Sequence, residues 1–330
     1  MKNSHSLQKE LNLVKKLIKN EIIEEKTISD LYKYIFKSDG KKLRAKLSLI
    51  TSSLNRRKNK KRLKLAAIIE LLHTATLVHD DVVDESQTRR GVKSVNNIWS
   101  NAHGVLIGDY IYSKAFILMV EIGEPKILRE LANATNDISK GELIQLDALQ
   151  NLSINLKQLE AISYFKTGRL FEASARTGAI LAGSETSFIN NVSKCAKYLG
   201  ILFQVKDDLL DYSLKEEAIG KPVFQDMKEG KVTYPFYFAY KNADKNDKTK
   251  LKSYLGKNKF NIKEAYNLIH KLNGISETEL LASKYLNQAV DAANTIKNKH
   301  VKEEMLKLIN SAFYRKKWAL YPSLVTAKMN

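Results

Sequence analysis

The sequence of 330 residues has little of what breaks helices or cross-links chains. It contains 4 prolines, 14 glycines and a single cysteine, Cys195. One cysteine cannot form a disulfide within the chain, which is typical of a protein from a reducing compartment. The scarcity of proline and glycine, together with abundant leucine, isoleucine, alanine, lysine and glutamate, favours a mostly helical protein.

The sequence also lacks long apolar runs. None approaches the ~20 residues of a membrane-spanning helix, and the charged stretch 1–28 has no apolar segment typical of a signal peptide. We therefore expect a cytoplasmic protein and leave open a peripheral contact with membranes.

Acidic residues are outnumbered, 36 against 55 basic ones, which gives a formal net charge of +19. Phosphates, nucleic acid or a membrane surface would suit this charge, and lysine enrichment spread over solvated faces explains it equally well. The basic run from Arg56 to Arg62 has the same two readings, anionic lipid contact or a solvated turn. A nucleic-acid-binding protein should interleave basic and aromatic residues or contain a known module, and we find neither.

Apolar residues recur at helical spacing along almost the whole chain. We find no strand pattern and no change of composition that would mark a linker, so residues 1–330 are predicted to form a single all-α domain. The expected helices cover 6–26, 28–36, 41–54, 63–84, 104–122, 126–149, 155–181 and 185–212, then a loop at 213–230 and shorter helices. Asn155 and Gln158 have the spacing of a capping box.

Three carboxylates lie at the C-terminal end of the helix expected over 63–84. At about 100° per residue, Asp80, Asp81 and Asp84 share one face. The helix dipole favours cations at that end, and like charges one turn apart repel. The pattern therefore indicates that a cation binds among these acids. A polar loop with Arg89 and Arg90 follows.

A second copy of this pattern ends the helix expected over 185–212. Asp207, Asp208 and Asp211 repeat the spacing, and Gln204 falls on the same face. Mg²⁺ prefers oxygen ligands and binds through carboxylates plus substrate phosphates. Two facing acid clusters could hold several Mg²⁺ around a diphosphate and neutralise it as a leaving group. A glycosidase is a poor alternative, because that chemistry needs two acids and not six.

With these motifs the sequence resembles the trans-isoprenyl diphosphate synthases, or polyprenyl synthetases, over nearly the whole chain. The matching elements, in order, are Gly40-Lys41-Lys42-Leu43-Arg44, the acids 80–84 with Arg89-Arg90-Gly91, Phe165-Lys166-Thr167-Gly168, the motif 203–211, Gly220-Lys221-Pro222 through Asp226, and 230–235. The resemblance implies the isoprenoid synthase fold, a bundle of long helices around a central cavity, and a homodimer.

The resemblance also implies a magnesium-dependent head-to-tail condensation, with three Mg²⁺ per active site. Asp80, Asp84 and Asp207 would hold the metal, Asp211 would complete the shell, and Asp81 and Asp208 would orient metal-bound waters. The allylic diphosphate would ionise to a carbocation, which the double bond of isopentenyl diphosphate attacks. Loss of a proton then gives a longer prenyl diphosphate.

The basic residues divide between the two substrates in this family. Those implied for the allylic diphosphate are Arg89, Lys166, Lys221 and Lys231, with Thr167 and Gln204 lining the site. Those implied for isopentenyl diphosphate are Lys41, Arg44, His73 and Arg90. Arginine gives bidentate phosphate contacts and lysine a point charge. A lone histidine is by default a core residue, but the resemblance to the family implies that His73 is a ligand of isopentenyl diphosphate. Thr167-Gly168 is either tolerated within a helix or forms a kink beside the substrate.

Four positions depart from the family pattern. Asp39, Lys42 and Ala45 replace a glycine, an arginine and a proline of the early element. Phe224 stands where many relatives have glycine, which puts the shape of the lysine-bearing loop in question.

Product length in this family depends on a tunnel that begins below the first acid motif. Ala75 and Thr76, the positions where bulky aromatics would block it, are small. We therefore expect a long all-trans product of the octaprenyl-to-decaprenyl class used for quinone tails. Leu72 could close the tunnel earlier, and a geranylgeranyl or farnesyl product is the alternative.

A terpene cyclase and a catalytically silent partner subunit are alternative functions. A terpene cyclase also carries acid motifs on helices, but it would not need the isopentenyl site. A catalytically silent partner subunit should have lost acids from one motif, and all six are present.

Overall fold

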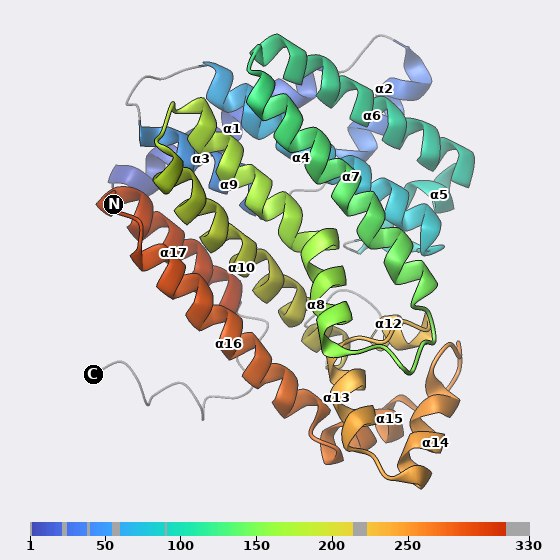
Figure 1. Cartoon of the computed structure of the whole chain (residues 1–330). Coiled ribbons are helices and arrows are strands. Elements are labelled where there is room, and N and C mark those ends of the chain that lie inside the picture. The colour runs from blue at the N-terminus through green and yellow to red at the C-terminus, as the bar shows by residue number, and fades with distance from the viewer. Residues whose placement is uncertain are drawn as a thin grey trace.

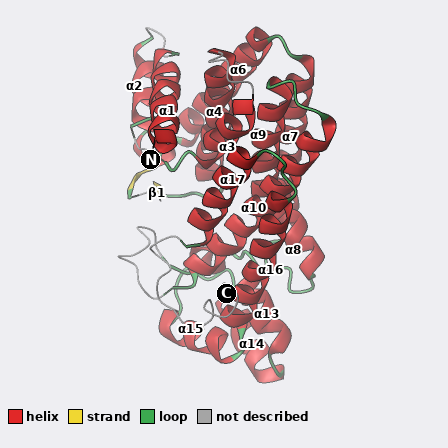
Figure 2. Cartoon of the chain, turned by 90° about the vertical axis from the view of Figure 1, so that its left-hand side faces the viewer, coloured by secondary structure: helices red, strands yellow, loops and turns green. Residues whose placement is uncertain are grey.

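The computed structural model describes residues 2–21, 25–37, 40–54, 60–89, 91–213 and 223–314. Helix dominates these ranges (Figure 2). The first half contains α1 (Lys2–Asn20), α2 (Lys26–Ile35), α3 (Leu43–Thr51), the 3₁₀ turn η1 (Ser52–Leu54), α4 (Lys60–Val83), α5 (Val95–Ile98), α6 (Asn101–Ile122) and α7 (Pro125–Asp147). The second half contains α8 (Leu156–Ser163), the π-helical turn η2 (Tyr164–Gly168), α9 (Arg169–Leu181), α10 (Thr186–Asp211), α12 (Gln225–Lys228), α13 (Tyr234–Asn242), α14 (Lys245–Tyr254), α15 (Ile262–Lys271), α16 (Gly274–Asn294) and α17 (Lys299–Phe313).

The all-α prediction is confirmed, and the helix ends follow local signals. The Asn155 side chain accepts a hydrogen bond from the Gln158 backbone, and the Gln158 side chain returns one to the Asn155 backbone. This is the capping box that the sequence predicted. Ser100 caps α6 by accepting from His103 N–H. Gly123 ends α6 at φ +69°, where glycine avoids the strain that a Cβ would bring.

Three sequence expectations need correction. The helix expected over 155–181 is interrupted by η2, so a five-residue π turn separates α8 from α9. The loop expected at 213–230 contains the short helix α12. A small antiparallel hairpin, β1 (Thr88–Arg89) and β2 (Val92–Lys93), follows the first acid motif where only a polar loop was expected. These features are too short for a periodic pattern to reveal them.

The long helices α4, α6, α7, α9, α10 and α16 run alongside one another, and α12–α15 pack at one end of this bundle (Figure 1). α4 packs against α6 and α3, while α10 packs between α9 and α16. Apolar side chains form three buried clusters: one joins α1–α4, α6 and α7, a second joins α8, the end of α10 and α13–α16, and a third joins α3, α9, α10, α16 and α17.

Close packing of α10 against η2 depends on two glycines. A Cβ on Gly200 would lie 2.6 Å from the Cα of Gly168, closer than real Cβ atoms approach backbone. The two helices therefore touch where Thr167 and Lys166 leave the regular helical path. The sequence left open whether Thr167-Gly168 is tolerated within a helix or forms a kink, and the structure places this pair at the end of the π-helical turn η2.

In the part of the chain that the structure describes, every helix is too short or too polar to cross a membrane.

Candidate active site

The first acid motif lies at the C-terminal end of α4, as predicted. Asp80 is in the last turn, and Asp84 follows the helix with its N–H donating to the Asp80 carbonyl at 2.8 Å. Burial raises the pKa of Asp80, and the charge of Asp84 raises it further. The cations Lys166, Arg89 and Lys231 oppose this rise. Asp80 therefore lies close to positive groups from three segments: the hairpin after α4, the turn η2 and the loop before α13.

The Asp81 side chain has a different partner from those of Asp80 and Asp84. Its side chain is buried, and its Oδ1 accepts a hydrogen bond from Arg89 Nε at 2.7 Å. Its backbone carbonyl accepts from Ser86 N–H at 2.9 Å. Asp81 thus holds the hairpin strand β1 and orients the Arg89 guanidinium beside Asp80.

The second acid motif ends α10, and its members also differ in their surroundings. Asp207 is half-buried. Asp208 is buried and accepts from Gln204 Nε2 at 2.8 Å and from the Tyr234 backbone N–H at 3.5 Å. Gln204 in turn accepts from the Thr167 hydroxyl at 2.6 Å. The chain of hydrogen bonds ties η2, α10 and the start of α13 together at the site.

Asp211 holds the loop that follows. Its two carboxylate oxygens accept the backbone N–H groups of Gln225 and Asp226 at 2.9 and 3.0 Å. These are the first two residues of α12, so Asp211 caps that short helix from another part of the chain. Burial and the nearby charge of Asp226 raise the pKa of Asp211 well above its ordinary value, as they do for Asp208.

Phe224 stands where the resemblance expects glycine, in the part of the lysine-bearing loop that the structure describes. Its φ is +57°, in the left-handed region that favours glycine. The ring is fully buried and packs against Tyr212 and Phe260 at centroid distances of 4.9 and 6.2 Å. The backbone N–H donates to the Asp211 carbonyl at 2.7 Å. Aromatic burial therefore offsets the backbone strain.

Lys231 joins the first acid motif to the loop that follows the second one. Its ammonium group lies 2.8 Å from Asp84 Oδ1 and 2.7 Å from Glu229 Oε2. Burial by itself would lower the pKa of Lys231, but the carboxylates of Asp226, Asp84 and Glu229 raise it above its ordinary value. Glu229 is fixed by Gln225, whose Nε2 donates to Glu229 Oε1 at 2.7 Å.

Lys166 is held by two residues that the sequence did not reveal. Its ammonium group donates to Glu142 Oε2 at 2.9 Å and to Gln145 Oε1 at 2.8 Å. Both acceptors lie on α7, three residues apart on one helix face. Burial raises the pKa of Glu142, and Lys166 opposes the rise. Gly141 allows η2 to approach α7 closely here, because a Cβ on Gly141 would lie 2.7 Å from Phe165 Cβ.

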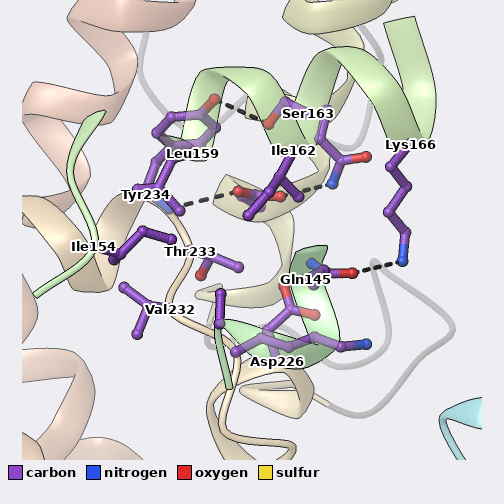
Figure 3. Close-up of a pocket in the computed structure, with 14 residues that line it drawn as sticks. Gln145, Ile154, Leu159, Ile162, Ser163, Lys166, Asp226, Val232, Thr233 and Tyr234 are labelled. Carbon is purple, nitrogen blue, oxygen red and sulfur yellow. Dashed lines mark hydrogen bonds between the residues drawn. The ribbon is translucent and has the colours of Figure 1, made fainter. Parts of the chain in front are cut away.

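A pocket of about 70 Å³ lies beside these groups (Figure 3). Lys166 and Gln145 face one another on one side, Asp226 lies at another, and the Tyr234 hydroxyl pairs with Ser163 Oγ at 2.9 Å. Its apolar wall comes from Ile154, Leu159, Ile162 and Val232. The pocket is thus lined by cationic, acidic and amide groups on one part and by apolar side chains on another.

The residues expected to bind isopentenyl diphosphate lie on α3 and α4 or beside them. Arg44 Nη1 lies 3.0 Å from His73 Nε2, and the Arg44 guanidinium stacks 4.6 Å above the centre of the Phe171 ring. Lys41, at the start of this segment, is exposed. Arg90, Lys221 and the part of the basic run from Arg56 to Asn59 lie outside the described residues.

The residues expected to set product length lie in α4, before Asp80. Leu72 and Ala75 are completely buried in the apolar cluster shared with α6. Thr76 is half-buried, and its hydroxyl donates to the His73 carbonyl at 2.8 Å. These three side chains lie on α4 before Asp80, and their role in product length stays a prediction.

The donor set of the site fits a divalent cation that prefers oxygen. Within the described ranges, no three His, Cys, Asp or Glu side chains are arranged to hold a metal ion by themselves. Mg²⁺ commonly binds through one or two carboxylates and completes its shell with substrate phosphates and water. Two separated carboxylate groups with cations between them suit a metal that arrives with a diphosphate.

Known proteins are similar to this chain in sequence and in fold. A sequence model of the family described as "Polyprenyl synthetase" matches residues 25–272. The octaprenyl diphosphate synthase of Escherichia coli (strain K12) is 40% identical over 212 residues, which are 64% of this chain and 66% of that enzyme, slightly less than two thirds of its length.

Two solved structures are similar over almost the whole chain. The decaprenyl diphosphate synthase from Rhodobacter capsulatus has a TM-score of 0.87 and 32% identity, covering 94% of this chain and 97% of that one. The polyprenyl synthase from Caulobacter crescentus, solved with calcium and isoprenyl diphosphate, has a TM-score of 0.89 and 31% identity, covering 94% and 96%.

Proposed function

The chain belongs to the polyprenyl synthetase family, and from this we infer that it is a trans-prenyltransferase that condenses isopentenyl diphosphate with an allylic diphosphate. We propose that residues 1–330 form one catalytic domain of this kind. The observation that carries the proposal is that the first acid motif lies among three cations. Asp208 of the second motif lines one pocket together with Lys166 and Lys231. Lys231 contacts Asp84 directly, and Asp80 is influenced by Lys166, Arg89 and Lys231 together.

We propose that Lys166, Lys231 and Arg89 bind the allylic diphosphate, with Lys221 as a fourth member from the resemblance. Each described cation is held in place by a carboxylate: Lys166 by Glu142, Lys231 by Glu229 and Arg89 by Asp81. Cations fixed before the reaction stabilise charge on a leaving group without reorganisation. Glu142, Gln145 and Glu229 therefore orient the cations that receive the diphosphate.

The metal proposed for this site is Mg²⁺, and when bound it neutralises the leaving diphosphate as a Lewis acid. We propose that Asp80, Asp84 and Asp207 hold it. We propose Asp226 as a further member of this set, because it lines the pocket together with Asp208 and Lys231. Asp211 supports the site by holding the Asp226 backbone, since both of its oxygens accept loop N–H groups.

We propose a long all-trans product, of the octaprenyl-to-decaprenyl class used for quinone side chains. The names of the similar enzymes from Escherichia coli and Rhodobacter capsulatus support this length. The small side chains of Ala75 and Thr76 below Asp80 support it as well. A shorter geranylgeranyl or farnesyl product is the alternative, because Leu72 is fully buried at the same helix face.

The direct test is incubation of the purified chain with Mg²⁺, labelled isopentenyl diphosphate and a series of allylic primers, followed by product-length analysis. We expect elongation to long prenyl diphosphates and none after chelation of the metal. Absence of elongation with every primer would contradict the enzyme proposal. A cyclised hydrocarbon formed without isopentenyl diphosphate would favour the terpene cyclase.

We also propose a homodimer formed through α6. Its outer face carries a stripe of exposed apolar side chains: Val105, Leu106, Phe116, Ile117 and Val120. Such a stripe on a surface helix is typical of an interface. Light scattering should give twice the mass of one chain, and Ile117→Lys combined with Leu106→Lys should give a monomer.

We further propose that the enzyme works in the cytoplasm and releases its apolar product at a membrane surface by peripheral contact. Cys195, the single cysteine, is a buried free thiol, which suits a reducing compartment. Co-flotation with anionic lipid vesicles in the presence of product tests the membrane contact.

A further inference from the structure

Helix α3 begins without a cap of its own. Its N-cap residue, Lys42, has φ 48° and ψ 40°, and within the described part of the chain its side chain makes no capping hydrogen bond. The first N–H groups of a helix have no partner inside the helix and need one from outside. A lysine cannot accept a hydrogen bond, so the cap has to come from elsewhere.

Glu70 of α4 supplies this cap. Its Oε1 accepts the backbone N–H of Ala45 at 3.1 Å, and Ala45 is the third residue of α3. This is the N–H that a capping side chain ordinarily binds. Glu70 is only 8% exposed, and its carboxylate lies at the positive end of the helix dipole. A buried acid twenty-five residues along the chain thus takes the place of the N-cap.

The capped turn carries a proposed substrate ligand. Arg44 immediately precedes Ala45, and its guanidinium lies 3.0 Å from His73 Nε2. His73 is one turn beyond Glu70 on the same helix. Glu70 and His73 therefore contact neighbouring residues in the first turn of α3. Glu70 accepts from the backbone of Ala45, and His73 contacts the side chain of Arg44. The position of Arg44 relative to His73 depends on both contacts.

We propose that Glu70 is the positioning residue of the isopentenyl diphosphate site: it caps α3 from α4 and thereby fixes Arg44 against His73. This inference rests on the proposed function for the identity of the ligand. Among the described residues, the cations proposed for the allylic site are held by other carboxylates, those of Glu142, Glu229 and Asp81. Its loss should therefore affect one substrate and spare the other.

The test compares Glu70→Gln, Glu70→Asp and Glu70→Leu in the full-length enzyme with Mg²⁺ and an allylic primer. Glutamine keeps an acceptor oxygen, aspartate keeps the charge but is shorter, and leucine removes the cap. We expect the KM for isopentenyl diphosphate to rise about tenfold for leucine and less for glutamine. The KM for the allylic diphosphate should stay within about twofold.

Glu10→Gln is the matched control. Glu10 also joins α4 to another helix, through its 3.0 Å contact with Arg62, but it lies away from the α3 N-terminus. We expect it to lower the melting temperature without changing either KM. A merely structural Glu70 would behave in the same way. Equal changes in both KM values, or a fall in kcat alone, would overturn the positioning role.

Equilibrium dialysis with labelled isopentenyl diphosphate separates this inference from the proposed function, and Glu70→Gln serves if the leucine variant does not fold. The wild type could fail to elongate any primer while the Glu70 variants still bind isopentenyl diphosphate more weakly than the wild type does. This result would contradict the enzyme proposal and uphold the positioning role. Equal binding by wild type and all folded Glu70 variants would overturn the positioning role.

Discussion

The ammonium group of Lys231 lies 2.8 Å from the carboxylate of Asp84, across 147 residues of sequence. The pair joins the end of α4 to the loop before α13. Glu229 holds the same ammonium group from the other side at 2.7 Å. The two halves of the site are therefore already linked by protein groups.

Replacing Lys231 with methionine should remove this link while keeping the length of the side chain. We expect kcat/KM for the allylic diphosphate to fall by about a hundredfold, because a fixed cation facing the leaving group is lost. Steady-state kinetics with varied primer checks it. Lys228→Met is the control, since the Lys228 ammonium group donates to the Val223 carbonyl at 3.3 Å and not, among the described residues, to a carboxylate. Similar losses in both variants would contradict a specific role.

Asp211 should behave as a loop anchor and less as a metal ligand. Asparagine at this position can accept only one of the two N–H groups, so the loop that carries Asp226 should loosen. We expect Asp211→Asn to raise the half-saturating Mg²⁺ concentration less than Asp80→Asn does. Activity titrated with Mg²⁺ measures both. A larger effect of the Asp211 change would place it among the direct ligands.

Ala75→Phe should shorten the product markedly. Ala75 is completely buried below Asp80, and a ring there would fill the space that the growing chain needs. Overpacking should also lower the free energy of unfolding by about 1–3 kcal/mol. Chromatography of the dephosphorylated products gives the length. Lys60→Phe, at the exposed start of the same helix, should leave the length unchanged. An unchanged product spectrum for Ala75→Phe would remove this residue from the tunnel.

Gly200→Ala should displace the π turn that carries Lys166. The added Cβ would meet the Cα of Gly168 at 2.6 Å, and backbone cannot move aside as a side chain can. We expect a loss of about 1–3 kcal/mol in the free energy of unfolding, with lower kcat. Denaturant melts and kinetics measure the two effects. Lys194→Ala, exposed on the same helix, should change stability by less than about 0.5 kcal/mol.

The Cys195 thiol should be inert in the folded enzyme. Burial raises its pKa to about 12, so the reactive thiolate is scarce at neutral pH and grows only as the pH approaches that value. In the unfolded chain the pKa returns to about 8.5. Iodoacetamide at pH 8 should therefore label the denatured protein and spare the native one. Rapid labelling of native enzyme at pH 8 would contradict this burial.

The glutamates that hold the site together could not be predicted from the sequence. Glu70 and Glu142 each stand on a long helix, and nothing in their local sequence shows that they face distant groups. Asp81 and Arg89 are close in sequence, but their 2.7 Å contact requires the hairpin that follows α4. These pairings depend on how helices pack, which the periodicity of one helix does not specify.

The sequence by itself determined the helical class, the capping box at Asn155 and the position of both acid motifs at helix ends. These follow from local rules: the 3.6-residue period, the hydrogen-bonding preference of cap residues and the geometry of neighbouring turns. Tertiary structure alone decided which carboxylate faces which cation. A helix fixes where its side chains begin, but the partner of a charge comes from another segment, and packing brings the two together.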